Sequence, residues 1–229
     1  MNKQNGTLVI LTRNEINGLK AIFDKIPVDK VSDVFAIDYK STDGTLEFFK
    51  KKHIKVVQQE KKGRAEAFRI GCRNAKSENV VFFSPDGNED PRQIIPLLEC
   101  LDDGYDMAIA SRFMKESKAE DEGVIAVRGF GNQAFTQIAN VLWRGKLTDS
   151  INGFRSIKKK KFLELNPDTE GFGIEYQLSI RALKKRFKIK EIPTVEGNRI
   201  GGQSTAKTFD TGMLFLKIIM HELKVGKKF

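Results

Sequence analysis

The sequence predicts an α/β protein with a Rossmann-like, mostly parallel central sheet flanked by helices. Short apolar runs at 7–12, 34–37 and 80–83 are each followed by turn residues and a helical pattern. Alternating strands and helices are typical of parallel sheets joined by right-handed crossovers. The chain has 229 residues, enough for one sizeable core, so we expect a single domain over residues 1–229.

Each expected element rests on its own local pattern. The strands are apolar runs rich in β-branched and aromatic residues, whereas the helices show apolar residues at intervals of three or four. Strands are expected at 7–12, 34–37, 56–57, 80–83, 107–110 and 188–195, and helices at about 13–26, 45–52, 63–76, 128–143, 171–186 and 208–224. Asp90 and Pro91 predict a further helix start, because they combine an N-cap residue with a first-turn proline. Residues 114–127 are charged and lack a clean period, which favours a loop.

The distribution of charge limits the classes of binding partner that we expect. The formal net charge is +10, and residues 151–229 hold 17 Lys and Arg against 8 Asp and Glu. A basic C-terminal third suits an anionic membrane surface or a phosphorylated substrate, although a solvated lysine-rich face is the commonest cause. Aromatic residues interleaved with basic ones are missing, so we exclude nucleic acid as the expected partner.

We also expect a cytoplasmic protein, with possible peripheral contact at the cytoplasmic face of a membrane. Cys72 and Cys100 are the only cysteines and are read as reduced core thiols. No signal peptide is apparent, and the most apolar stretch, 213–220, is too short to span a bilayer. His53 and His221 stand alone, and no spacing suggests a zinc site.

Three carboxylates follow predicted strands and are expected at one edge of the sheet. Glu15, Asp38 and Asp86 each stand where a strand gives way to a turn. Open α/β sheets bind their ligands at the carboxyl ends of the strands, so three acids there indicate a polar ligand. Two plainer explanations stay open: Asp86 and Asn88 shape a turn, and Glu15 stabilises a helix start by about 0.3–1 kcal/mol.

Five segments in order carry a family resemblance. These are LTRNE at 11–15, AIDYKSTDGT at 36–45, KKGRAEAFRIG at 61–71, FFSPDGNEDP at 82–91 and IASRF at 109–113. Over residues 7–207 the chain resembles family 2 glycosyltransferases with the GT-A fold, most closely the dolichol-phosphate mannosyltransferases and polyprenyl-phosphate glycosyltransferases. The resemblance implies a nucleotide-sugar-binding half at 1–112, an acceptor half at 113–207 and an amphipathic basic tail at 208–229. It also implies inverting transfer of a sugar from GDP-mannose or a UDP-sugar to a polyprenyl phosphate.

The resemblance implies the following donor-site residues. Leu11, Arg13, Glu15, Ile37 and Asp38 would line the base and ribose pocket, and Arg64 and Arg112 would neutralise phosphates. Asp86 would be the second acid of a D-x-D motif that binds Mg²⁺ or Mn²⁺, with Asn88 as a further ligand. Ser84 replaces the first acid, so we expect weaker metal binding.

The acceptor half is implied in the same way. TDSINGFRS at 148–156 is similar to the family's D-x-x-S-G-F-R motif, with Asn152 in place of Ser. Asp149 would approach the sugar or acceptor and would act as a base if that acceptor is a hydroxyl. The residues expected near the acceptor or its phosphate are Arg128, Arg155, Glu175, Arg199, Ser204 and Lys207. A surface loop whose glycines need positive φ is an equal reading of 196–207.

Several alternatives remain open on the sequence. The acceptor is a lipid phosphate, or it is a hydroxyl of a glycan or small molecule with Asp149 as the base. A protein of another class would bind nucleotide sugars without catalysis, having lost its metal through Ser84. The tail at 208–224 suits an amphipathic helix on an anionic bilayer, but equally one packed on the domain or on a partner chain.

Overall fold

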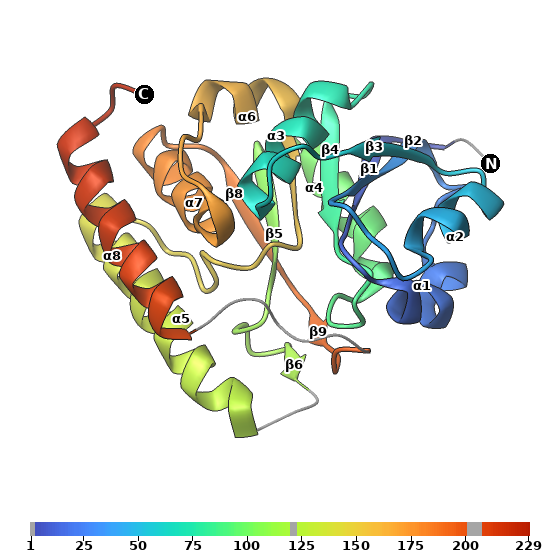
Figure 1. Cartoon of the computed structure of the whole chain (residues 1–229). Helices are drawn as coiled ribbons and strands as arrows, with labels where there is room; N and C mark the ends of the chain where they lie inside the picture. Colours follow the sequence, from blue (N-terminus) through green and yellow to red (C-terminus); the bar gives the residue numbers. More distant parts are fainter. Residues whose placement is uncertain (1–2, 120–122, 201–207) are drawn as a thin grey trace.

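A computed structural model describes residues 3–119, 123–200 and 208–229, and gives side chains for 3–118, 129–200 and 210–229. Its centre is a seven-stranded sheet with the order β3-β2-β1-β4-β7-β5-β8 (Figure 1). The strands are β1 (Gln4–Thr12), β2 (Val31–Asp38), β3 (Lys55–Gln58), β4 (Asn79–Phe83), β5 (Met107–Ser111), β7 (Arg155–Lys158) and β8 (Ile189–Pro193). A small parallel pair is formed by β6 (Lys118–Ala119) and β9 (Val195–Glu196). The expected α/β fold with a mostly parallel sheet is confirmed.

Helices cover both faces of the sheet. They are α1 (Ile16–Ile22), α2 (Thr45–Lys51), α3 (Arg64–Asn74), α4 (Ile94–Asp102), α5 (Gly123–Trp143), α6 (Lys159–Leu165), α7 (Ile174–Lys184) and α8 (Thr208–Val225). Three short 3₁₀ helices are η1 (Phe23–Lys25), η2 (Pro91–Gln93) and η3 (Gly171–Gly173). The expected cap at η2 is present, because Asp90 Oδ1 accepts from the Arg92 backbone N–H at 3.0 Å with Pro91 in the first turn.

The core lies on both faces of the central strands. In β1, Leu8, Val9 and Ile10 are all fully buried, and alternate residues join separate apolar clusters on the two faces. Val9 packs in the cluster that contains α3 residue Phe68, whereas Leu8 and Ile10 pack in the cluster that contains α4 residue Leu97. Burial on both faces explains why the central strands read as continuous apolar runs instead of alternating ones.

One strand differs from the expectation. No strand was expected at 155–158, but β7 lies there, separates β4 from β5 and runs antiparallel to both. Two of its four residues, Arg155 and Ser156, are polar yet fully buried, and an apolar-run criterion does not recognise such a segment.

The C-terminal helix α8 packs on the protein itself. It lies beside α5 and α7 (Figure 1), with Phe215, Ile218 and Ile219 buried against Tyr176 and Ala139. Of the readings left open for this tail, packing on the chain's own core is therefore observed. In the part of the chain that the structure describes, no helix has the length and apolarity needed to cross a membrane.

A buried charge cluster fixes α8 to α7. The fully buried Glu222 carboxylate accepts from Arg181 Nε at 2.7 Å and from Lys184 Nζ at 2.6 Å. Gln177 Nε2 donates to the same carboxylate at 2.9 Å. All three partners come from α7, so the cluster specifies where α8 docks.

We predict that Glu222→Gln destabilises the protein by roughly 3–5 kcal/mol, because it leaves the buried Lys184 without a counter-charge and leaves Arg181 with Asp168 alone. Urea unfolding followed by circular dichroism measures the change in the free energy of unfolding. The control is Glu164→Gln, which breaks an exposed pair with Lys161 and is expected to change stability by about 0.5 kcal/mol or less. Equal effects of the two substitutions would contradict the assignment.

Candidate functional site

Two adjoining cavities lie at the carboxyl ends of β1, β2 and β4. The first, here called the strand-edge cavity, has a volume of about 260 Å³ and is lined by Leu11, Arg13, Glu15, Ile37, Tyr39 and Arg199 among others. The second, the helix-side cavity, has a volume of about 360 Å³ and reaches Phe135 of α5 and Phe215 of α8. Both cavities are lined by Arg64, Ser84, Asp86 and Phe172, which therefore mark their junction.

The turn after β1 is locked to the turn after β2, and this positions Glu15. Asn14, with φ of 56°, donates its backbone N–H to Ser41 Oγ at 2.8 Å and accepts from the Thr42 N–H at 2.8 Å. Asp43 accepts from the Ile16 N–H at 3.0 Å, which satisfies a free donor at the start of α1. The STDGT segment thus orients the neighbouring helix, and Glu15 is held at the cavity edge.

Asp86 sits on a turn that only glycine allows. Gly87 has φ of 94°, and a Cβ there would lie 2.9 Å from the Asn198 carbonyl oxygen. The close approach lets the Ile200 N–H donate to the Asp86 carbonyl at 2.7 Å. The segment around 198–200 is therefore anchored directly over the end of β4.

Arg199 joins two of the predicted acids. Its guanidinium lies 2.6 Å from Asp86 Oδ2 and 2.6 Å from Glu15 Oε1. Glu15 and Asp86 thus meet at one edge, as expected from parallel strands. Burial raises the pKa of Glu15 to about 7, with Arg199 opposing the shift and the nearby Asp86 carboxylate adding to it.

Arg64 is held at the junction of the cavities by three partners. It forms an ion pair with Glu175, donates to Ser84 Oγ at 3.0 Å and lies 3.6 Å from Glu89 Oε1. Gly153 makes room for it, because a Cβ at that position would lie 2.0 Å from Arg64 Nη2. Arg64 therefore lines both cavities, and Glu175 lines the helix-side cavity with it; the phosphate-neutralising role that the resemblance implies for Arg64 stays a prediction.

Glu89 is a site residue that the sequence analysis missed. It lines the helix-side cavity, and its Oε2 accepts from the Ser84 backbone N–H at 2.7 Å. Burial raises the pKa of Glu89 to about 8; Arg64 opposes this shift and Asp86 adds to it. The sequence did contain a signal for Glu89: an additional acid stands five residues after Ser84, the serine that replaces an expected acid.

Asp149 does not line either cavity, contrary to the role of base considered for it. It is fully buried, and its carboxylate accepts from Arg112 Nε at 2.7 Å and from Arg112 Nη2 at 3.1 Å. The N–H groups of Ile151 and Asn152 also donate to it. Burial opposes its ionisation, but Arg112 and these donors hold the pKa of Asp149 below its ordinary value. Arg112 itself lines the helix-side cavity and also lies 3.6 Å from Glu196.

Two other predicted residues are buried next to the site and do not line its cavities. Arg155 is fully buried and donates to carbonyl groups that include Glu175 O at 3.0 Å, so its guanidinium does not line either cavity. Asp38 is also fully buried, and it accepts from the Ser41 N–H at 2.9 Å and from Thr12 Oγ1 at 3.1 Å. The third acid therefore builds the turn after β2 and does not share the cavity with Glu15.

The remaining predicted residues divide into two groups. Leu11, Arg13 and Ile37 line the strand-edge cavity, and Asn88 lines the helix-side cavity. Ser204 and Lys207 lie outside the described residues, as does the side chain of Arg128, whose backbone is part of α5.

The two cavities carry opposite formal charge in their described linings. The strand-edge cavity is bordered by Arg13, Lys62, Arg64 and Arg199, against only the two carboxylates Glu15 and Asp86. The helix-side cavity has Arg64 and Arg112 against the four carboxylates Asp86, Glu89, Glu175 and Glu196. The described lining of the first cavity thus favours an anionic ligand, whereas the second cavity needs a bound cation before it suits an anion.

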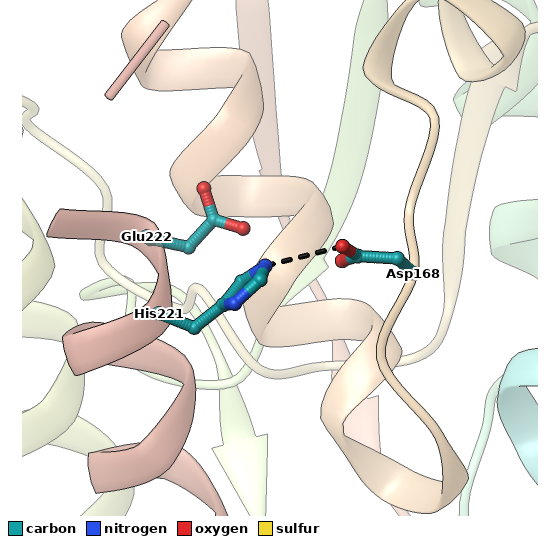
Figure 2. Close-up of side chains that lie close together, drawn as sticks. All are labelled: Asp168, His221 and Glu222. Carbon is teal, nitrogen blue, oxygen red and sulfur yellow. Dashed lines mark hydrogen bonds and ion pairs between the residues drawn. The ribbon is translucent and has the colours of Figure 1, made fainter. Parts of the chain in front are cut away.

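A further group of potential metal ligands lies outside both cavities, where α8 meets the loop before η3 (Figure 2). Asp168, His221 and Glu222 offer ligand atoms within 4.8 Å of one another, and His221 Nε2 is 3.1 Å from Asp168 Oδ2. Glu222 already pairs with Arg181 and Lys184, and Arg181 also lies 2.6 Å from Asp168. Because two fixed cations occupy this group, we assign it to the packing of α8.

Comparison with known proteins settles the family. The family model described as Glycosyl transferase family 2 matches residues 7–165. The chain belongs to this family. Its sheet also superposes on glucosyl-3-phosphoglycerate synthase from Mycobacterium tuberculosis, solved with Mn²⁺, UDP and phosphoglyceric acid, with a TM-score of 0.71. That match has 19% identity and covers 96% of this chain and 78% of the other, and it supports the GT-A fold alone.

Curated relatives are glycosyltransferases as well. The glycosyltransferase AglJ of Haloferax volcanii is 25% identical over 90% of this chain and 68% of its own length. A dolichol-phosphate mannosyltransferase of Pyrococcus furiosus is 29% identical over 88% of this chain, which spans only 59% of that protein. A dolichyl-phosphate hexose transferase of H. volcanii is 27% identical over 85% of this chain and 83% of its own length. The expectation of a family 2 glycosyltransferase is confirmed.

We predict that Glu15→Gln stabilises the ligand-free enzyme more at pH 8 than at pH 5. The Glu15 pKa is about 7 when folded against an ordinary 4.5, so the folded state holds a proton that the unfolded chain has lost between these values. The contribution of this group to stability therefore falls as pH rises from about 4.5 to 7. Melting temperatures of variant and parent at both pH values measure it. A similar pH-dependent gain in Glu47→Gln, an exposed carboxylate on α2, would contradict the prediction.

Proposed function

We propose that this family 2 glycosyltransferase moves a sugar from a nucleoside diphosphate sugar to a lipid phosphate, with inversion at the anomeric carbon. The observation that carries the proposal is the pair of joined cavities. One is basic and lies at the strand ends, and the other runs between two helices whose outer faces expose apolar side chains. Two curated relatives are named for dolichyl or dolichol phosphate, in agreement with a lipid acceptor.

The strand-edge cavity suits the nucleotide of the donor. Leu11 and Ile37 provide apolar walls, and Tyr39 provides a ring over which Arg13 lies at 5.5 Å. Lys62 and Arg199 add positive charge for the diphosphate. We therefore place the base between β1 and β2 and the diphosphate near Asp86, at the junction with the other cavity.

The residues at the end of β4 fit a divalent cation. Asp86 supplies a carboxylate, and Asn88 Oδ1 is buried with no hydrogen-bond partner. Mg²⁺ prefers oxygen ligands and is commonly held by one or two carboxylates together with substrate phosphates. Asp86 and Asn88 would hold Mg²⁺ or Mn²⁺ there, and the ion would neutralise the departing diphosphate.

The surrounding residues fix the geometry of the displacement. Arg64 and Arg199 are positioned to stabilise charge on the leaving diphosphate, and the acceptor approaches from the helix-side cavity on the opposite side of the sugar. A phosphate acceptor is already an anion and needs no base. The burial of Asp149 is therefore compatible with a lipid phosphate and removes the base that a hydroxyl acceptor was expected to use.

A hydroxyl acceptor remains the second candidate because of the carboxylates in the helix-side cavity. Glu175 lines that cavity and would take the place of Asp149 as the general base. The two candidates differ in the acceptor that supports turnover: a polyprenyl phosphate for the first, and a sugar or small alcohol for the second.

Contact with a membrane is proposed through α5 and α8. Phe130 and Val141 of α5 are 77% and 78% exposed, and Met220 and Leu223 of α8 are each 55% exposed. Exposed lysines accompany them on and after α8, at Lys217, Lys224, Lys227 and Lys228. An apolar face bordered by basic residues suits the surface of an anionic bilayer, from which a lipid acceptor enters the cavity between these helices.

We predict that Asp86→Ala lowers transfer roughly 10²–10³-fold or more without unfolding the protein, since charge stabilisation at the leaving group is lost. Nucleoside diphosphate release from GDP-mannose or UDP-glucose, with a polyprenyl phosphate in detergent and Mn²⁺, reports the rate. The exposed Asp103→Ala is the matched control and is expected to retain activity. Undiminished turnover in Asp86→Ala would remove the proposed centre.

The donor is identified by thermal stabilisation. A ligand that binds only the folded state at 100 times its Kd adds about 2.7 kcal/mol to stability. GDP-mannose, UDP-glucose and the free diphosphates are tested with and without Mg²⁺ or Mn²⁺. We expect one base to raise the melting temperature, and more so with the metal. No shift with any of these ligands would contradict the donor site.

We predict that Met220→Glu abolishes binding to vesicles that contain anionic phospholipid, because it places a carboxylate on the proposed membrane face. Co-sedimentation with vesicles measures binding. Leu163→Glu on α6 is the matched control, since Leu163 is 56% exposed and Met220 is 55% exposed. Equal loss in both variants, or none in either, would argue against docking through α8.

A further inference from the structure

We propose that Glu89 supplies the second carboxylate of the cation site, in place of the acid that Ser84 lacks. The inference rests on the proposed function, because it assigns a residue to the divalent cation of the donor site. It concerns a side chain within the 82–91 segment to which the resemblance assigns no role.

The carboxylate of Glu89 lies against position 84. The Ser84 backbone N–H donates to Glu89 Oε2 at 2.7 Å, so the side chain reaches back across the end of β4. Its Oε1 is 3.6 Å from Arg64 Nη2, which is beyond hydrogen-bond distance. The side chain is 12% exposed, and it lines the same cavity as Asp86 and Asn88.

The charges around Glu89 call for a cation. The described lining of the helix-side cavity has four carboxylates and two guanidiniums, so acidic side chains outnumber basic ones there. Both guanidiniums are shared between two carboxylates: Arg64 lies closer to Glu175 than to Glu89, and Arg112 lies closer to Asp149 than to Glu196.

The oxygen of Asn88 provides an independent sign of a ligand. Asn88 Oδ1 is buried without a hydrogen-bond partner, and a buried acceptor left unpaired costs about 1–3 kcal/mol. Asp86, Asn88 and Glu89 belong to one turn and offer carboxylate and amide oxygens, which are the ligands that Mg²⁺ and Mn²⁺ prefer. The acid is thus moved five residues along the chain, and the site retains two carboxylates.

A purely structural role for Glu89 would be to hold the turn through Ser84 and Arg64. Glu89→Gln tests this difference, since the amide oxygen still accepts from the Ser84 N–H while the charge is lost. The double variant Ser84→Asp with Glu89→Gln returns an acid to the position where the family motif has one. Ser84→Asp would restore the cation affinity lost in Glu89→Gln only if the Glu89 carboxylate binds the cation.

The experiment measures Mn²⁺ affinity by electron paramagnetic resonance, with saturating UDP and, separately, saturating GDP, and without any acceptor. We expect Glu89→Gln to weaken Mn²⁺ binding by about tenfold or more, and the double variant to restore most of the loss. Glu196→Gln removes one carboxylate from the same cavity and is expected to leave the Mn²⁺ affinity within about threefold of the parent.

The outcomes separate this inference from the proposed function. Loss of Mn²⁺ binding in Asp86→Ala together with parental affinity in Glu89→Gln overturns the role of Glu89 and leaves the proposed function standing. Failure of the double variant to recover affinity also overturns it, provided that circular dichroism shows the variant folded. A parent enzyme that binds no Mn²⁺ with either nucleotide overturns both proposals.

Discussion

The ion pair between Arg64 and Glu175 holds the site together, because it connects three parts of the fold at the junction of the two cavities. Arg64 is the first residue of α3, Glu175 lies in the first turn of α7, and Ser84 and Glu89 belong to the turn after β4. A largely buried guanidinium needs such partners, since an unpaired charge there would cost several kcal/mol. The position of Glu175 is fixed in turn by Arg155 underneath, which donates to the Glu175 carbonyl.

The parts of the fold that could be predicted follow from periodicity and from the geometry of parallel strands. Apolar runs located the central strands because these are buried on both faces. Glu15 and Asp86 could be placed together because β1 and β4 are parallel neighbours, paired from Thr7 with Val80 to Ile10 with Phe83. The contact of both acids with Arg199, more than a hundred residues later in the chain, depends on the path of a loop that no local pattern specifies.

The differences between the expected and the observed positions of these side chains also have physical reasons. A motif identifies a residue type at a position, but it does not show on which side of the backbone the side chain lies. Asp149 and Arg155 belong to one motif segment, and both side chains lie beneath the cavities where they satisfy buried groups. Asp38 is likewise used by the Ser41 and Thr12 donors of its own turn and its neighbouring strand. Glu89 was missed for the opposite reason: the resemblance assigns it no role, but its side chain reaches back to the Ser84 N–H and lines the helix-side cavity.

The ion pairs of Arg199 in the ligand-free site suggest how the donor diphosphate and the cation would replace one another's partners. In the ligand-free enzyme, the single guanidinium of Arg199 is shared between the carboxylates of Glu15 and Asp86. Under the proposed function, a donor diphosphate offers Arg199 a better partner, while a divalent ion replaces Arg199 on Asp86. Asp86 and Arg199 each exchange one counter-charge for another, whereas Glu15 loses the guanidinium that lowers its pKa, which favours its protonated form. The diphosphate draws Arg199 away from Asp86, and the cation then pairs with the Asp86 carboxylate. Binding of the diphosphate and binding of the cation are therefore expected to favour each other, because coupling between two ligands is reciprocal.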